Sequence, residues 1–136
     1  IRRPDDVQIY ESMMVDVRGA VTTGLLKGVR FVKDNRLLPR GFDKAAAPAD
    51  IAVQGDAAQD PDFTDDGDRV RYRVDTGGAS GPMHVHVELW YQPIAFRWAR
   101  NLAAYDVREP RRFLSQFGAM ASQSSVVVAS ARFDVP

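Results

Sequence analysis

The sequence predicts a mainly β protein, an antiparallel β-sandwich with two short helices inserted before the last strand. Apolar and polar residues alternate in several short stretches, and glycines and prolines separate these stretches. Two prolines in the C-terminal half each open a stretch with helical spacing. Several strands joined by turns favour a sandwich. A mixed α+β fold is the alternative, because residues 8–18 and 19–33 could be partly helical.

The first part of the chain has the pattern of short strands. Apolar residues alternate over residues 7–17, with Glu11 as the misfit, and Gly19 ends this strand. Residues 21–44 suit two short strands and a turn better than a long helix, because four residues break them: Gly24, Gly28, Pro39 and Gly41. Residues 51–55 are a further short strand candidate.

Residues 69–75 and 83–92 alternate most regularly. Val70, Tyr72 and Val74 share one face of the first stretch, opposite three arginines. In the second stretch four apolar residues are expected to face the core: Val85, Val87, Leu89 and Tyr91. The glycine-rich segment 76–82 between them predicts an antiparallel hairpin.

Two helices and a strand are expected to complete the chain. Pro93 suits a first helical turn, and apolar residues then recur every four positions to about Tyr105. Pro110 opens a second helix with one apolar stripe, formed by Phe113, Leu114, Phe117 and Met120. Residues 126–135 alternate again and predict the last strand.

Composition excludes several classes of function. The 136 residues contain 18 basic and 18 acidic side chains, so no net charge favours nucleic acid as a partner. No cysteine is present, which excludes disulfides and thiolate chemistry in this chain, and no apolar run is long enough for a membrane span. The length fits a single domain, 1–136. Because the sequence begins without methionine, we expect it to be a fragment of a longer protein, and the resemblance described below implies that it is the C-terminal part.

Both histidines lie in one strand candidate, as His84-x-His86-x-Glu88. Residues two apart share a strand face, so these side chains could bind a divalent metal. A complete zinc site needs further ligands, however, and the simpler expectation is a polar, solvated face opposite Arg69, Arg71 and Arg73. Trp90 lies on the same outward face and could contact a partner, although the helix that follows is expected to cover it. We therefore take Trp90, His84 and His86 as the candidate binding residues.

An aspartate-rich loop is the second candidate site. Clustered carboxylates on a flexible loop can bind calcium. The EF-hand pattern does not match, and aspartate with glycine is also the usual composition of a solvated turn, so an ordinary loop is the favoured interpretation. The calcium candidates are Asp60, Asp62, Asp65, Asp66 and Asp68.

The sequence gives no catalytic constellation. No serine lies in a G-x-S-x-G motif, and both histidines that could act as a base belong to one strand. We therefore expect no enzyme, and a hydrolase is the least favoured function.

Several segments together resemble a known arrangement. These are "FVKDNRLLPRGFDK", "DRVRYRVD", "VHVELWYQPIAFRWARNL" and "EPRRFLSQF". In this order they resemble the haem-free C-terminal domain of exported bacterial multihaem cytochrome c-like proteins. The resemblance implies a periplasmic or secreted setting and haem in an upstream region. No haem role passes to this chain, which lacks Cys-x-x-Cys-His.

The expected function is that of a non-catalytic accessory or interaction module in a larger exported protein with a possible electron-transfer role. Its partner would be its own upstream domain or another protein, and the chain itself is expected to hold no cofactor. A carbohydrate- or calcium-binding module is the alternative. The sequence does not predict the oligomeric state.

Overall fold

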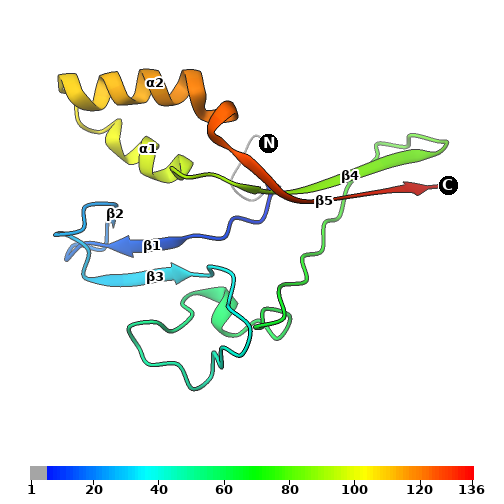
Figure 1. The fold of residues 1–136 in the computed structure, drawn as a ribbon, viewed down its shortest axis with the longest axis horizontal. Coiled ribbons are helices and arrows are strands. Elements are labelled where there is room, and N and C mark those ends of the chain that lie inside the picture. The colour runs from blue at the N-terminus through cyan, green and yellow to red at the C-terminus, as the bar shows by residue number, and fades with distance from the viewer. Residues whose placement is uncertain (1–5) are drawn as a thin grey trace. The chain divides into compact units, whose positions relative to one another are not determined.

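The computed structural model of the protein describes residues 6–136 (Figure 1). The chain divides into two compact units, Ile1–Tyr72 and Arg73–Pro136. Each unit contains one antiparallel sheet, and the second also contains two α-helices. The fold is therefore a mixture of helices and antiparallel strands, and a β-sandwich is not confirmed. The expectation of a single domain stays a prediction.

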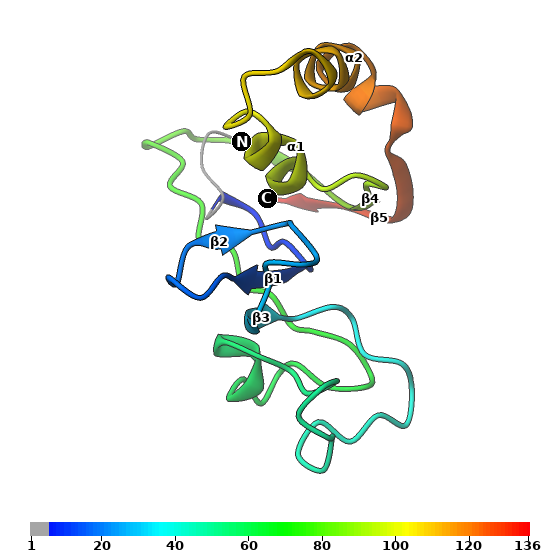
Figure 2. The same ribbon diagram turned by 90° about the vertical axis from the view of Figure 1, so that its left-hand side faces the viewer.

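The sheet of the first unit has three short strands in the order β2-β1-β3: Ser12–Val15 (β1), Val21–Thr22 (β2) and Arg30–Asp34 (β3). Figure 2 shows β1 between the other two. The turn after β1 is closed by Asp16, whose carboxylate accepts the N–H groups of Ala20 and Arg18 at 3.0 and 2.9 Å. These bonds stabilise the ionised form and lower the pKa of Asp16. Gly19 adopts a φ of 79° there, which a side chain would disfavour.

Asn35 holds the N-terminal segment against the end of β3. Its side chain is almost buried, at 3% exposure. The amide oxygen accepts the Glu11 N–H at 2.9 Å, and the amide nitrogen donates to the Ile9 carbonyl at 3.1 Å. Asparagine thus continues the pairing where regular strand geometry has stopped, because its amide imitates a peptide group.

The preceding residue, Asp34, ties a third segment to the same place. Its backbone exchanges two 3.0 Å hydrogen bonds with Gln54. Its carboxylate forms two bonds with the Arg36 guanidinium, at 2.8 and 2.6 Å, which raise the pKa of Arg36. The "DNR" triplet therefore joins β3 to the segments on both sides of it.

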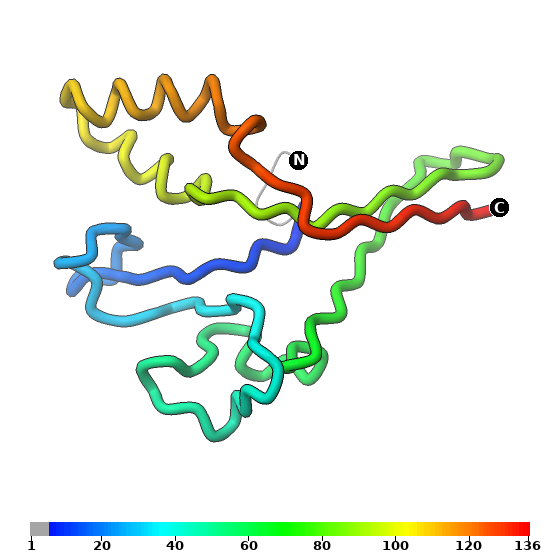
Figure 3. Tube along the Cα trace, viewed as in Figure 1, coloured from blue at the N-terminus to red at the C-terminus, as the bar shows by residue number. Residues whose placement is uncertain are grey.

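The second unit is built on a long two-stranded ribbon, Met83–Tyr91 (β4) paired antiparallel with Val126–Val135 (β5). The trace leaves β4, passes through two helices and returns into β5 (Figure 3). These helices are Phe96–Leu102 (α1) and Arg108–Ser124 (α2). The prediction of two helices before the last strand is confirmed.

The helical segment is closed at its base, and α2 carries one aromatic pair along its length. Gln92 Nε2 donates to Ser124 Oγ at 3.0 Å, which joins the residue after β4 to the end of α2. On α2, Phe113 and Phe117 stack with their ring centroids 6.0 Å apart. Ala99 of α1 is buried. No helix among residues 6–136 is long and apolar enough to cross a membrane.

The prediction of a hairpin between residues 69–75 and 83–92 is wrong. Residues 69–75 form no strand, and the partner of β4 is β5. Two of the arginines are instead drawn to one carboxylate, since Asp62 lies 3.0 Å from Arg71 and 3.9 Å from Arg69. The β5 strand also offers a longer complementary partner, because its alternation matches β4 without interruption from Met83 to Leu89.

Smaller differences concern strand length. The strand predicted over 7–17 is regular only in β1, because Asn35 replaces backbone pairing at its start. The two short strands predicted in 21–44 are present as β2 and β3. Of residues 51–55, Gln54 alone forms a bridge, with Asp34. The segments 8–18 and 19–33, considered as possible helices, contain strands and turns.

Replacing Asn35 by leucine should destabilise the protein. The Glu11 N–H would lose its acceptor at a cost of about 1–3 kcal/mol, whereas the Ile9 carbonyl would keep its hydrogen bond from Lys33 Nζ. Urea denaturation followed by circular dichroism measures this loss. The exposed Gln59 is the control, and Gln59→Leu should change stability by less than about 0.5 kcal/mol. Equal effects of the two substitutions would contradict the role given to Asn35.

Candidate functional site

The β4–β5 ribbon is amphipathic across both strands. Opposed residues share a face of a sheet. One face is apolar, with the pairs Met83–Val135, Val85–Phe133, Val87–Ala131 and Leu89–Ala129. The other is polar, with the pairs His84–Asp134, His86–Arg132 and Glu88–Ser130. The period-two pattern predicted for residues 83–91 therefore exists, with a different partner strand.

The polar face carries the three residues predicted to bind. His84 Nδ1 lies 2.7 Å from Asp134 Oδ1, and these side chains are 81% and 76% exposed. His86 Nε2 lies 3.4 Å from Glu88 Oε1. The imidazoles are thus exposed, but the expectation that three arginines of residues 69–73 lie opposite them is wrong. Their cross-strand neighbours are Asp134 and Arg132.

Trp90 extends this face beyond Glu88. Its indole nitrogen donates to Glu88 Oε2 at 3.0 Å, which fixes the ring beside the carboxylate. Trp90 remains 50% exposed, so the helix that follows does not bury it. The ribbon is irregular here, because Leu89 pairs with Ala129 whereas Trp90 pairs with Val127. The extra residue of this bulge is Val128, on β5, so β4 keeps its regular alternation.

The apolar face of the ribbon is also open, so the expectation that Val87 and Tyr91 face the core is wrong. Val87 is 45% exposed, and Phe133 and Tyr91 are exposed as well. In the part of the chain that the structure describes, β4 and β5 pair only with each other. A two-stranded ribbon with two open edges and an open apolar face is marginally stable alone, so its geometry suits a surface that another chain covers.

The five carboxylates of the aspartate loop do not converge. Asp65 accepts the Gly41 N–H at 2.7 Å, and Asp60 accepts the Asp62 N–H at 2.9 Å. Asp62 pairs with the arginines already described, and the Asp66 N–H donates to Thr64 Oγ1 at 3.2 Å. Within residues 6–136 no group of three histidine or carboxylate side chains could hold a metal ion.

Asp68 is the fifth of these aspartates and lies away from the others, beside the N-terminal segment. Its carboxylate accepts the Tyr10 hydroxyl at 2.9 Å and the Gln8 amide at 3.2 Å. Burial and this hydrogen bond raise the pKa of Tyr10 well above its usual range. The Tyr10 hydroxyl acts as a donor that holds Asp68 against the N-terminal segment.

A lysine that the sequence analysis did not single out organises the aspartate loop. The Lys44 ammonium donates to the carbonyls of Ala57 at 3.2 Å and Phe63 at 2.7 Å, and also to that of Asp60. It lies 5.8 Å from the centre of the Phe63 ring, which is 1% exposed. The backbone oxygens that could attract a cation are thus already bound to the protein's own ammonium.

Composition contained a signal for Lys44. The chain has only three lysines among its 18 basic residues. An ammonium is a compact donor of three hydrogen bonds, whereas a guanidinium is a planar fork that fits a cluster of carbonyls less well. A rare lysine beside an aspartate-rich loop could therefore have been recognised as a structural cation.

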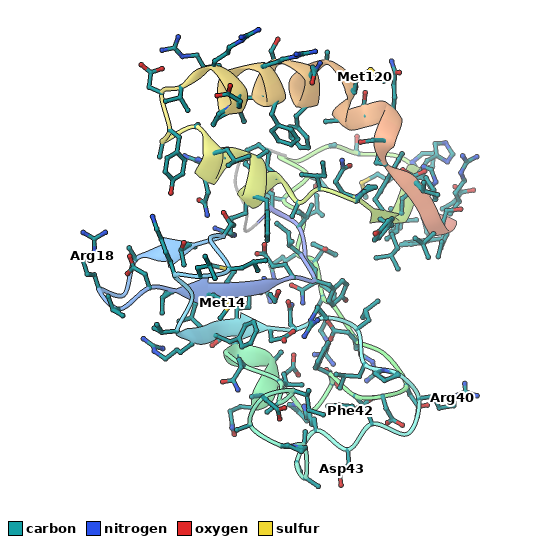
Figure 4. The ribbon with its side chains drawn as sticks, turned by 60° about the vertical axis from the view of Figure 1, so that its left-hand side comes forward. Met14, Arg18, Arg40, Phe42, Asp43 and Met120 are labelled. Carbon is teal, nitrogen blue, oxygen red and sulfur yellow. The ribbon has the colours of Figure 1, made fainter. Side chains whose placement is uncertain are left out.

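An open depression of about 330 Å³ adjoins this lysine. It is lined by Gly41, Phe42, Asp43, Lys44, Thr64 and Asp65. Figure 4 shows Phe42 and Asp43 on the loop that follows β3. The Lys44 ammonium is bound to carbonyls and the Asp65 carboxylate to Gly41, so the charged groups beside the depression already have partners within the loop.

Replacing Lys44 by methionine should destabilise the first unit, because three carbonyl oxygens would lose a charged donor at a cost of about 1–3 kcal/mol. Thermal denaturation measures the effect. Calcium should not change the Tm of the unmodified protein, since its candidate ligands are dispersed. The exposed Lys27 is the control, and Lys27→Met should have a much smaller effect. A calcium-dependent rise in Tm of the unmodified protein would restore the calcium hypothesis.

No family model, no curated protein and no solved structure matches this chain.

Proposed function

We propose that the chain is a non-catalytic interaction module that binds a protein partner through the β4–β5 ribbon. The observation that carries the proposal is the ribbon itself, an amphipathic two-stranded sheet that pairs with no other strand of residues 6–136 and has exposed side chains on both faces. A protein partner suits it because strand edges bind extended backbone and open apolar faces bind other apolar surfaces.

The composition of the ribbon also supports protein binding. Its accessible residues include Trp90 and Tyr91, and large aromatic side chains are enriched where proteins meet. The Trp90 ring is held by Glu88 before any partner arrives, which lowers the conformational entropy lost on binding. The charged groups lie along one face, where they can select the register of a partner strand.

We assign the two histidines to recognition rather than catalysis. A general base needs a substrate proton within hydrogen-bond reach and benefits from a site that excludes water. The His84–Asp134 pair is mostly exposed on a ribbon surface, where water screens its charges. The same pair is well placed to present a donor and an acceptor to another chain.

A carbohydrate-binding module is the second candidate, because the half-exposed indole of Trp90 could stack on a sugar ring. A rise in Tm with a soluble glycan, lost in Trp90→Ala, would favour this alternative over a protein partner.

A photo-reactive phenylalanine in place of Tyr91 should capture the partner in cells that produce the protein. Tyr91 lies at the end of β4 next to Trp90, and both are exposed. We expect one discrete adduct, and Trp90→Ala in the same chain should reduce its yield about tenfold, as for a central aromatic contact. An unchanged circular dichroism spectrum would show that the variant is folded.

Phe96 provides the matched control for this experiment. It is an exposed aromatic residue on α1, outside the ribbon. The same photo-reactive residue at position 96 should give no discrete adduct. No adduct from position 91, or one that is indifferent to Trp90→Ala, would contradict the proposed function.

The exported setting belongs to the same proposal and rests on the resemblance to multihaem cytochrome c-like proteins. It predicts Cys-x-x-Cys-His motifs in the coding sequence upstream of Ile1. Reading that sequence tests it, and a hydrolase domain there would replace this setting.

A further inference from the structure

We infer that the partner of the ribbon is a second copy of this chain, joined through the open edge of β4. Two β4 strands would pair antiparallel around a two-fold axis at Val87, and two ribbons would form one four-stranded sheet in the order β5-β4-β4-β5. This inference rests on the proposed function and names its partner.

The sequence of β4 is self-complementary about Val87. A two-fold axis at this residue places Val87 opposite itself, Val85 opposite Leu89 and Met83 opposite Tyr91 of the second copy. All these residues lie on the apolar face or at its end. The apolar face of one ribbon would therefore continue without interruption into that of the other, as sheet pairing requires.

The polar face is complementary in the same register. His86 faces Glu88 of the second copy, and Glu88 faces His86, so two opposite-charge or hydrogen-bonded pairs form at once. His84 faces Trp90 of the second copy. No two like charges are opposed along the strand, and zero net charge on the chain removes long-range repulsion between copies.

Neighbouring registers are less complementary. An axis at His86 would oppose two histidines, each already beside Arg132 of its own ribbon. An axis at Val85 would place His84 opposite His86 and bring Pro82, which has no N–H group, into the ladder. On the other side of Val87, an axis at Glu88 would oppose two carboxylates, and an axis at Leu89 would bring Pro93 into the ladder. Val87 is therefore the most complementary centre.

The β4 edge is also better suited than that of β5. The bulge at Val128 lies on β5 and interrupts its alternation, whereas β4 is regular from Met83 to Tyr91. Self-pairing of β5 brings Arg132 opposite Asp134 only with an axis at Phe133, which aligns only residues 131–135.

A cysteine at the axis tests the inference directly, because the chain contains no other cysteine. Opposed residues of an antiparallel pair have Cβ atoms about 4.5–5.5 Å apart, close to the separation in a disulfide. In Val87→Cys we expect a disulfide-linked dimer to form on mild oxidation. Ala131→Cys is the matched control, because Ala131 lies opposite Val87 on β5 and shares its face.

The cross-linking result has clear alternatives. Dimer formation about tenfold faster at position 87 than at position 131 supports the inference, because only the former lies on the axis. Equal rates, or a faster reaction of His86→Cys than of Val87→Cys, would overturn it.

A charge exchange tests the same register without cysteine. Glu88→Lys would place an ammonium opposite His86 of the second copy and should raise the dissociation constant of the dimer about tenfold. Adding His86→Glu to that variant should restore association, because the pair is then reversed. Glu109→Lys on α2 is the control for the change in net charge. Sedimentation measures the dissociation constant of the unmodified protein and of the three variants.

Sedimentation and photo-crosslinking at position 91 together separate the second-copy inference from the proposed function. A chain that sediments as a monomer at every concentration, while position 91 still gives a discrete adduct of another mass, would overturn the second copy and leave the interaction module standing. A monomer with no adduct at all would contradict both. An adduct of twice the chain mass, lost in Glu88→Lys and restored in the double variant, would support both.

Discussion

The pairing of β4 with β5 is the constraint on which the second unit depends. It joins strands that are separated in the sequence by the whole helical pair, and the Gln92–Ser124 hydrogen bond closes the base of that pair. The register of this pairing determines which residues are neighbours, including His84 with Asp134 and His86 with Arg132. The surface proposed to bind a partner is therefore a product of long-range pairing, with Trp90 positioned locally by Glu88.

Local patterns predicted the elements of this unit well but not their partners. Alternation showed that His84, His86 and Trp90 share one face of a strand, and the two prolines marked the helical region. Alternation specifies which residues of a strand share a face, however, and any strand of matching period can pair with it. In the structure Asp62 engages Arg69 and Arg71 from outside the predicted hairpin. A salt bridge of this kind has no local signature.

The first unit was less predictable, because single side chains replace regular pairing in it. The Asn35 side chain extends the pairing beyond the end of β3, and the Lys44 ammonium binds a cluster of carbonyls created by the path of the loop. Neither role follows from periodicity. The aspartates were correctly recognised as belonging to a loop, but their individual partners, from Gly41 to Tyr10, depend on tertiary structure. Composition alone could not distinguish aspartates that converge on a metal ion from aspartates that each bind a different part of the protein.

The helical insertion between β4 and β5 has a consequence for how this unit folds. Closing a long flexible connection costs chain entropy, and sheets with distant strands fold slowly for that reason. Helices form within about a microsecond and need only local contacts. An α1–α2 pair that forms early shortens the effective loop and brings Tyr91 near Val126. Strand pairing can then propagate from there toward Met83 and Val135. Early formation of the helices would thus speed the pairing of β4 with β5, although the helices leave the surface of that ribbon uncovered.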